Sequence, residues 1–294
     1  MNLYYYQDPI GNFGDDLNPW LWPQLFPAPL EHCFDDNTLF LGIGSILNHK
    51  ISEHPGKKIV FGSGFGYGSP PTITNDWRFF CVRGPLTAKL LALPEQMAIS
   101  DSALLVRELI EPAPKSDGAP AFMPHHVTTQ HHNWRDVCES LSIRYIDPAA
   151  PVEQTIALIR QSSVVIAEAM HGVIMADALR VPWIPVRTRS GILEFKWQDW
   201  SSSLALEHKF EWLPPVWHYG HHAHAKRALH PVATIVARER LRWLVRFGRR
   251  RLSNEVVFRQ VYDRLREAFC RLVDEAIDRE HIWDEQNTRV ADRL

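Results

Sequence analysis

Short apolar runs, each ending in a glycine or a turn residue and separated by segments of helix length, constrain the fold of this chain more than any other feature. Such runs are typical of strands that are buried on both faces of a parallel sheet. We predict strands at residues 2–6, 38–43, 58–62, 77–82, 121–123, 143–146, 163–167 and 183–186, and helices at residues 86–93, 152–161 and 172–179. This alternation predicts an α/β fold.

The chain divides at a proline-rich stretch, residues 111–120 with the sequence EPAPKSDGAP, which has the composition of a linker or a crossing loop. We therefore predict two Rossmann-like lobes, residues 1–115 and 116–215, that face each other across a cleft. Ligands of such sheets bind at the carboxyl ends of the strands. From about residue 231 the sequence becomes arginine-rich and helical, and residues 216–294 are predicted to form a basic helical C-terminal appendage.

Composition excludes several classes of protein. The 294 residues are 45% hydrophobic and 22% charged, as in an ordinary globular domain, and the formal net charge of -2 gives no reason to expect nucleic acid as a partner. The four cysteines form no CxxC pair, which argues against a zinc ribbon. The N-terminus has no signal-peptide pattern and no apolar run reaches about 18 residues, so we expect a cytoplasmic protein that does not span a membrane.

Residues 11–18, with the sequence GNFGDDLN, follow the first predicted strand and open a helical segment. Backbone amides at such a helix start can receive an anion or a sugar hydroxyl, and Asp15 and Asp16 would then stand at the edge of the cleft. Aspartate in the first turn of a helix also serves as a cap, without any catalytic role. The glycine spacing does not match GxGxxG, so NAD binding is not predicted.

Two glycine-rich loops and one arginine are further candidates. The loops GIGS (residues 42–45) and GSGFG (residues 62–66, which include Gly64) end predicted strands, where glycine permits either the close approach of a ligand or tight packing. Arg83 ends another strand, and a guanidinium buried there needs an anionic partner. That partner is either a carboxylate or phosphate of the substrate or an internal Asp or Glu.

The segment VVIAEAMHGVIMADAL, residues 164–179, places His171 in the turn between a buried strand and a helix that starts at Gly172. An anion bound there would meet the imidazole and the helix N-terminus together. Glu168, at the same strand end, would orient His171 or cap the helix. His125 and His126 follow another strand and either line the cleft or lie in an exposed loop.

Taken in order, the motifs between about residues 4 and 213 resemble the polysaccharide pyruvyl transferases, and within them the branch that forms ketals on exopolysaccharides. The motifs are GNFGDDLN, FLGIGSIL, VFGSGFG, VRGPLTA, SDSALL, AEAMHGVIMADALRVPWIPV and EFKWQDW. The resemblance implies lobes arranged as in glycosyltransferase-B (GT-B) enzymes, phosphoenolpyruvate as the donor, and a sugar acceptor on a lipid-linked repeat unit. It implies no cofactor and no metal.

The family's donor-binding arginine maps onto Arg83, and its histidine maps onto His171. Relatives carry Arg-Leu-His at that turn, whereas this chain has Ala169-Met170-His171, so one donor-binding arginine is missing. Phosphoenolpyruvate carries a carboxylate and a phosphate and needs two or three cations. We expect Lys196, or else an arginine of residues 187–189, to supply the missing charge.

The resemblance also suggests the remaining roles. His171 is the expected acid or phosphate partner, while Asp15 or Asp16 would orient or deprotonate the acceptor hydroxyl. The other expected contacts are glycines at the donor, Gly64 and Gly172, and polar or aromatic side chains at the acceptor, Asn12, Asp16 and Trp197. A tryptophan in such a fold is more often a packing residue.

The C-terminal appendage carries arginines interleaved with apolar and aromatic residues between residues 238 and 251. Such a helix suits the inner face of the cytoplasmic membrane, or else it packs on the lobes or on a second subunit of a homo-oligomer. The histidine-rich run at residues 218–224 is expected to be a flexible loop rather than a metal site. Two other functions compete: a nucleotide-sugar-dependent glycosyltransferase, and an inert membrane-associated assembly partner.

Overall fold

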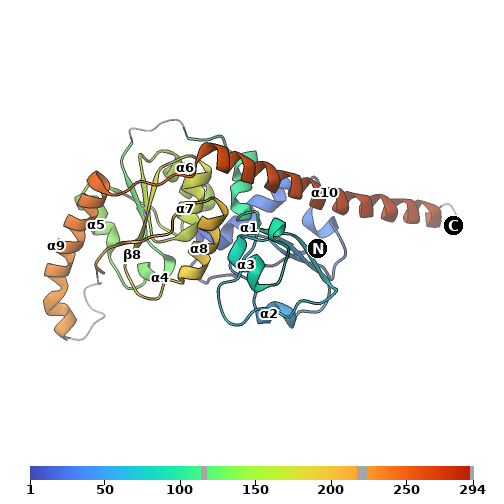
Figure 1. Cartoon of the computed structure of the whole chain (residues 1–294), viewed down its shortest axis with the longest axis horizontal. Helices are drawn as coiled ribbons and strands as arrows, with labels where there is room; N and C mark the ends of the chain where they lie inside the picture. Colours follow the sequence, from blue (N-terminus) through green and yellow to red (C-terminus); the bar gives the residue numbers. More distant parts are fainter. Residues whose placement is uncertain (114–117, 217–223, 292–294) are drawn as a thin grey trace.

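A computed structural model describes residues 1–113, 118–216 and 224–291, in which every strand belongs to one of two parallel sheets (Figure 1). The first sheet has the order β1-β2-β3-β4: β1 (Asn2–Leu3), β2 (Leu39–Leu41), β3 (Lys58–Phe61) and β4 (Trp77–Cys81). The second has the order β6-β5-β7-β8-β9: β5 (Ala121–Met123), β6 (Arg144–Tyr145), β7 (Val165–Ala167), β8 (Trp183–Arg187) and β9 (Glu211–Trp212). The eight predicted strands and the α/β class are confirmed.

Helical segments connect the strands of the first sheet or follow its last strand. They are α1 (Phe13–Leu25), α2 (His49–Ser52) and α3 (Pro85–Leu90), with the 3₁₀ helices η1 (Leu30–His32), η2 (Glu95–Met97) and η3 (Ser102–Glu108). α3 begins with proline at its first position, as predicted, because proline has no N–H to leave unpaired there. Gly84 precedes it, and a Cβ at this position would lie 2.1 Å from the Asp199 carbonyl oxygen of the second lobe.

The order of the second sheet positions the site. Its helices are α4 (His126–Thr129), α5 (Trp134–Ser140), α6 (Val152–Arg160), α7 (Met170–Ala178) and α8 (Glu194–Ser203). From β5 the chain first adds β6 on one side and then β7 on the other. The connections after β5 and after β7 therefore part in opposite directions, which leaves a crevice outside the carboxyl ends of these two strands.

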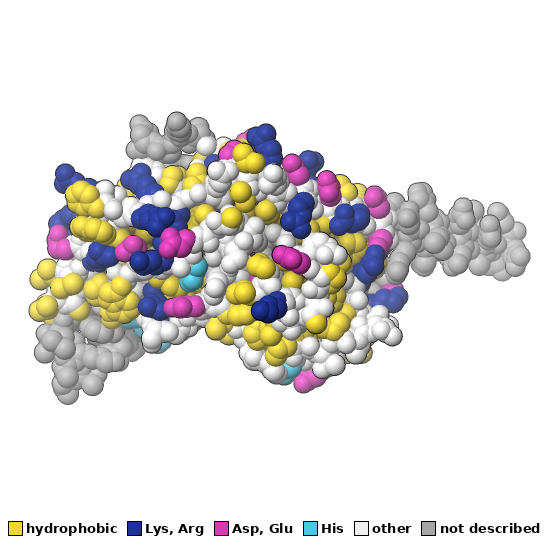
Figure 2. All heavy atoms as spheres, in the orientation of Figure 1, with side chains coloured by type: hydrophobic (Ala, Val, Ile, Leu, Met, Phe, Trp, Pro, Cys, Tyr) yellow, Lys and Arg dark blue, Asp and Glu magenta, His cyan; other side chains and the backbone are white. Residues whose placement is uncertain are grey.

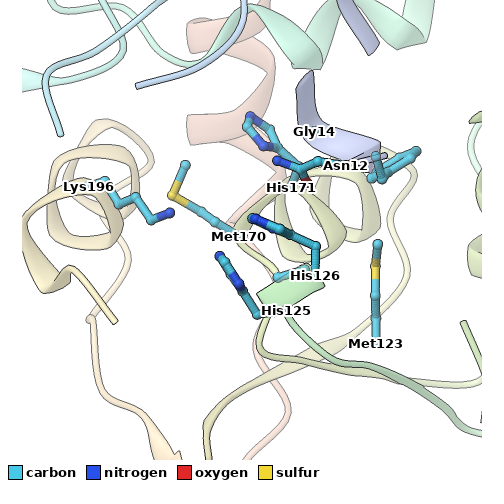
Figure 3. Close-up of a pocket in the computed structure, with 10 residues that line it drawn as sticks. Asn12, Gly14, Met123, His125, His126, Met170, His171 and Lys196 are labelled. Atoms are coloured by element: carbon cyan, nitrogen blue, oxygen red, sulfur yellow. The ribbon is translucent and has the colours of Figure 1, made fainter. Parts of the chain in front are cut away.

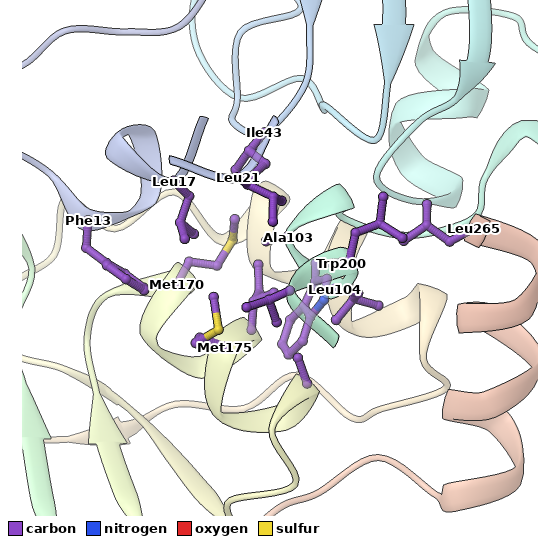
Figure 4. Close-up of a cluster of buried hydrophobic side chains, with 14 of the residues drawn as sticks. Phe13, Leu17, Leu21, Ile43, Ala103, Leu104, Met170, Met175, Trp200 and Leu265 are labelled. Carbon is purple, nitrogen blue, oxygen red and sulfur yellow. The ribbon is translucent and has the colours of Figure 1, made fainter. Parts of the chain in front are cut away.

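The two lobes share one hydrophobic core. Buried side chains of α1, η3, α7 and α10 meet in a single cluster, which includes Leu17, Leu104, Met175 and Leu265 (Figure 4). Burial of large apolar side chains contributes roughly 1.5–3 kcal/mol each, so contacts across this cluster hold the lobes together strongly. The proline-rich stretch between the lobes lies partly outside the described residues, which omit 114–117.

Two long helices end the chain. α9 (His224–Phe247) packs on the second sheet through Ala237, Leu241 and Leu244, which are fully buried. α10 (Glu255–Ala291) crosses to the first lobe, as Figure 1 shows, and its Phe269 packs against aromatic rings there. Within the described parts of the chain, no helix combines the length and the apolar character needed to cross a membrane.

Candidate functional site

A pocket opens at the crevice between β5 and β7, where the two lobes meet (Figure 3). It encloses about 340 Å³ of empty space, part of it open to solvent. The walls come from the start of α1, the end of β5, the start of α7, and α8. The lining residues are Asn12, Phe13, Gly14, Met123, His125, His126, Ala169, Met170, His171 and Lys196.

The GNFGDDLN motif forms the wall of the pocket that comes from the first lobe. Its two glycines let residues of the second lobe approach the backbone closely. Gly11 has φ +95, in the left-handed region that favours glycine, and lies against Ala149 of the second lobe. The Phe13 N–H then donates to the Pro148 carbonyl at 2.7 Å. At Gly14, a Cβ would lie only 2.0 Å from Nδ1 of His171. Glycine at this position therefore lets the imidazole lie directly against the start of α1.

An aspartate that the sequence reasoning did not select, Asp101, faces His171 from the other side. Nε2 of His171 lies 3.5 Å from Oδ2 of Asp101, which is fully buried. The other oxygen of Asp101 accepts from the Ala103 N–H at 3.0 Å, so the carboxylate caps η3 and faces the imidazole at once. Nε2 of His171 and Oδ2 of Asp101 are both buried and face each other without forming a hydrogen bond in this arrangement. Asp101 belongs to the SDSALL motif, which offered a signal for it.

Asp15 and Asp16 lie in the first turn of α1, beside the pocket but outside its lining. Asp15 accepts from the Asn12 side chain, and Asp16 accepts from the Asn12 backbone N–H at 3.0 Å. Asp16 thus has the capping contact that was one of its two predicted roles. Burial raises the pKa of Asp15 from 3.8 to about 6, although the positive charges of His171 and Lys196 oppose the shift.

The histidine pair at the end of β5 forms the floor of the pocket. The rings of His125 and His126 lie 4.2 Å apart between centroids, and Nε2 of His126 lies 3.4 Å from Oδ2 of Asp8. Burial lowers the pKa of His125 to about 2 and also lowers the pKa of His126, so both rings favour the neutral form. Of the two predicted locations, the cleft is the one that the structure shows.

Glu168 has a different role from the two that we predicted. It is fully buried, and one carboxylate oxygen accepts from both the N–H and the hydroxyl of Thr188. The other oxygen accepts from the His125 N–H at 3.1 Å. Glu168 therefore ties the loop after β5 to the loop after β8, and so fixes the backbone of the histidine pair. Among the described residues, neither the His171 ring nor a backbone N–H at the start of α7 donates a hydrogen bond to Glu168.

Lys196 supplies the positive charge at the mouth of the pocket. It extends from α8 toward the histidine pair (Figure 3), and its Nζ donates to the Tyr67 hydroxyl at 3.2 Å. Arg187 and Arg189 were the predicted alternatives to Lys196. Arg187 forms an ion pair with Glu194, with Nη1 2.8 Å from Oε1. Arg189 approaches Nδ1 of His125 at 3.4 Å and does not line the pocket. Lys196 is thus the one of these three cations that lines the pocket.

Arg83 forms an ion pair with an acidic residue of the chain, which was one of its two predicted partners; the other was a carboxylate or phosphate of the substrate. Its guanidinium is fully buried, with Nε 3.1 Å from Oδ2 of Asp199, and it also donates to the Ser45 hydroxyl and the Phe65 carbonyl at 2.7 Å each. These partners belong to the loops after β2 and β3 and to α8. Arg83 therefore joins the first lobe to the helix that carries Lys196, and it lies outside the pocket lining.

The remaining predicted contacts pack within the protein. A Cβ at Gly64 would lie 2.4 Å from Cζ of Arg83, and a Cβ at Gly172 would lie 2.6 Å from the Met123 sulfur. Both glycines are therefore required by close packing. Trp197 is buried next to Phe210, with the ring centroids 4.9 Å apart, and does not line the pocket.

Metal binding has little support from the described residues, which contain no group of three or more histidine, cysteine, aspartate or glutamate side chains placed to hold an ion. The histidine-rich run at residues 218–224 lies outside the part of the chain whose side chains are described.

Comparison with known proteins agrees with the motifs. Residues 4–190 match the family described as polysaccharide pyruvyl transferase. The chain is also 38% identical over 216 residues to the succinoglycan biosynthesis protein ExoV of Rhizobium meliloti (strain 1021), an alignment that covers 71% of this chain and 66% of that protein. The chain belongs to the polysaccharide pyruvyl transferase family. The predicted membership of this transferase family is thereby confirmed.

The part of the chain that matches the family contains most of the pocket. The start of α1, the ends of β5 and β7, and Asp101 all lie within residues 4–190. Lys196 lies beyond residue 190, on α8. Lys196, the cation that we expect to replace the missing arginine, therefore lies in a part of the chain that the family match does not include.

Proposed function

We propose that this family member transfers pyruvate from phosphoenolpyruvate to two hydroxyls of a sugar, forms a cyclic pyruvate ketal and releases inorganic phosphate. One observation carries the proposal: a single crevice is lined by the Lys196 ammonium and by His171, which faces the buried Asp101 carboxylate, and the Asp15 carboxyl, whose pKa is raised, lies just outside this lining. A histidine and a carboxyl group placed close together are suited to act as acid and base.

The donor would bind with its negative charges toward Lys196 and His171, with the N-terminus of α7 close by. Helix N-termini favour anions because their first N–H groups are free to donate. The Lys196 ammonium has no ion pair with a described acidic residue, so a ligand would not have to displace one. Arg83 would act indirectly, by holding α8 in place.

We assign proton delivery to His171. A protonated imidazole carries a proton on each nitrogen, and the one on Nε2 faces Asp101, which leaves the one on Nδ1 for the substrate. Its transfer to the methylene carbon of phosphoenolpyruvate makes a methyl group and leaves positive charge on the central carbon. The first sugar hydroxyl then attacks that carbon, and Asp15 removes the hydroxyl proton.

Ketal closure completes the atom balance. Phosphate leaves with the electron pair of its C–O bond, and the second hydroxyl attacks the same carbon and loses its proton. Of the two hydroxyl protons, one replaces the proton that His171 donated and the other leaves with the phosphate. The carboxylate is unchanged throughout, so no oxidant, cofactor or metal is required by this scheme, and phosphoenolpyruvate is the only co-substrate.

The acceptor is proposed to be a sugar of a lipid-linked polysaccharide repeat unit, modified on the cytoplasmic face of the membrane. It would enter from the open side of the pocket, next to Asn12 and Asp16 at the start of α1. Tyr67 is 54% exposed and touches Lys196, so it offers a flat ring beside the mouth on which a sugar could stack. We also propose that the lobes are arranged as in GT-B enzymes.

Thermal unfolding with phosphoenolpyruvate tests the donor assignment. A ligand that binds only the folded protein raises its stability, by about 2.7 kcal/mol at a hundred times Kd. We expect the stabilisation in wild type, and an affinity weakened roughly tenfold in Lys196→Ala and in His171→Ala, since each removes a charge-assisted contact. Lys57→Ala is the matched control, because Lys57 pairs with Asp35 on the surface.

Turnover completes the test. Release of inorganic phosphate from phosphoenolpyruvate should require a saccharide acceptor and should be lost in His171→Ala. Stabilisation by a nucleotide sugar alone would contradict the proposal and favour a glycosyltransferase. Binding of phosphoenolpyruvate without phosphate release, across acceptor fractions from the organism's own polysaccharide precursors, would favour an inert assembly partner.

A further inference from the structure

α9 has two apolar faces, and the fold uses only one of them. Ala237, Leu241 and Leu244 are fully buried against the second sheet. On the opposite side, five apolar residues are strongly exposed: Val232 60%, Ile235 61%, Val236 50%, Trp243 43% and Phe247 61%. We call these five residues the outer stripe. Exposed apolar side chains in such number and proximity mark a binding surface.

The outer stripe follows the helix axis. Val232 and Val236 are four residues apart, as are Trp243 and Phe247, and the two pairs are seven residues apart, so all four lie on one side of α9, with the charged Glu239 and Arg240 on the turn between the pairs. Figure 2 shows hydrophobic side chains gathered beside basic ones at the end of the molecule that α9 forms in Figure 1. The stripe therefore faces away from the first lobe and is not covered by described residues.

Arginines flank the outer stripe on both sides. Arg240 lies on one side and Arg242 and Arg246 on the other, and residues 231–251 contain seven arginines and a single acidic residue. The Arg240 guanidinium lies 4.3 Å from the Trp243 ring, and that of Arg246 lies 5.2 Å from the Phe247 ring. Of the three flanking arginines, Arg240 and Arg242 each pair with a glutamate, and Arg246 supplies positive charge that no described acidic residue neutralises.

This combination favours one occupant. An apolar ridge with aromatic residues, bordered by arginines, matches the boundary between lipid headgroups and acyl chains in an anionic bilayer. A second copy of the chain fits less well, because a symmetric contact would bring the same arginines face to face. The nearby acids are already used: Glu211 by Arg240 and Glu239 by Arg242.

We propose that α9 lies in the surface of an anionic membrane, with the outer stripe among the acyl-chain ends and the flanking arginines at the headgroups. The proposal extends the proposed function by naming the surface that holds the protein where a lipid-linked acceptor is found. It does not depend on the donor chemistry, because none of its residues lines the pocket.

Vesicle flotation with the purified full chain tests it. Vesicles that contain phosphatidylglycerol should bind the wild type, while vesicles of phosphatidylcholine alone should bind it much more weakly. Trp243→Ser with Phe247→Ser, and separately Arg242→Gln with Arg246→Gln, should each weaken binding roughly tenfold or more. Raised salt should weaken the arginine contribution. As a control, Val256→Ser with Arg259→Gln on α10 removes side chains that are 63% and 73% exposed, and should leave binding unchanged.

Two further measurements separate the outcomes. Stabilisation by phosphoenolpyruvate should be the same in the outer-stripe variants and in wild type, so failure of the membrane proposal and failure of the donor assignment are distinguishable. Absence of wild-type binding to anionic vesicles, or equal binding by the stripe variants, would overturn the proposal. A wild-type dimer in light scattering that becomes monomeric in the stripe variants, without vesicle binding, would assign the stripe to a second copy instead.

Discussion

Replacing Asp15 with asparagine should make the protein more stable at neutral pH while abolishing transfer. Burial raises the pKa of this carboxyl from 3.8 to about 6, so the folded protein binds the proton more tightly than the unfolded chain does. Wild-type stability should therefore fall as pH rises from about 4 through about 6. At 1.36 kcal/mol per pH unit, the shift corresponds to a cost of at most about 3 kcal/mol above pH 7.

Asparagine keeps the shape of the side chain and can still accept the hydrogen bond from Asn12. The variant should thus gain up to about 3 kcal/mol at pH 8, equivalent to a rise in Tm of roughly 5 °C, and almost nothing at pH 4. Urea unfolding of both proteins at several pH values between 4 and 8 measures this difference directly. Phosphate release, measured in parallel, should be lost because no base remains.

Asp16→Asn is the matched control on the same helix turn. The Asp16 carboxylate caps the start of α1, where negative charge is favourable, so its removal should lower stability by roughly 0.5–1 kcal/mol at pH 8. A stability difference between Asp15→Asn and wild type that does not grow with pH would refute the reasoning. So would an Asp15→Asn protein that is less stable than wild type at pH 8.

Three further changes probe the contacts around His171 and α8. Gly14→Ala should lower the transfer rate roughly a hundredfold, because its Cβ would lie 2.0 Å from the His171 ring, and unchanged steady-state kinetics would show that the imidazole need not lie there. Asp101→Asn should lower kcat roughly tenfold or more while phosphoenolpyruvate binding changes little, which single-turnover and binding measurements separate. Arg83→Ala should cost about 3–5 kcal/mol in urea unfolding, because it leaves the Asp199 carboxylate buried without its partner; a loss below about 1 kcal/mol would contradict this.

The strands and the location of the site could be predicted because both follow from local patterns. Continuous apolar runs are buried on both faces of a parallel sheet, and polar residues just after them collect at one edge. This places His125 and His171 in the same crevice. The edge strand β9 escaped prediction because it has two residues, one half-buried and one exposed, and so has no apolar run.

Partners that lie far apart in sequence could not be predicted from such patterns. Arg83 needed an anion, yet nothing near it in the chain indicates that Asp199, 116 residues later, would provide one. Asp101 similarly meets His171 only because η3 packs on α7. Lys196, which lines the pocket, was selected by a different route: the family resemblance implied a doubly anionic donor, and the arginine expected to bind it is absent from this chain.

The contact between Phe13 and Pro148 and the buried pair of Arg83 and Asp199 fasten the lobes together at two places beside the pocket. α10 begins beside the second lobe and packs along the first through its residues up to Ala276, so it adds a brace across both lobes. A hinge motion would have to break all of these contacts at once. If the proposed reaction takes place in this pocket, its cycle should be paced by chemistry or by diffusion of the substrates into and out of the pocket, and turnover should not be gated by opening of the lobes.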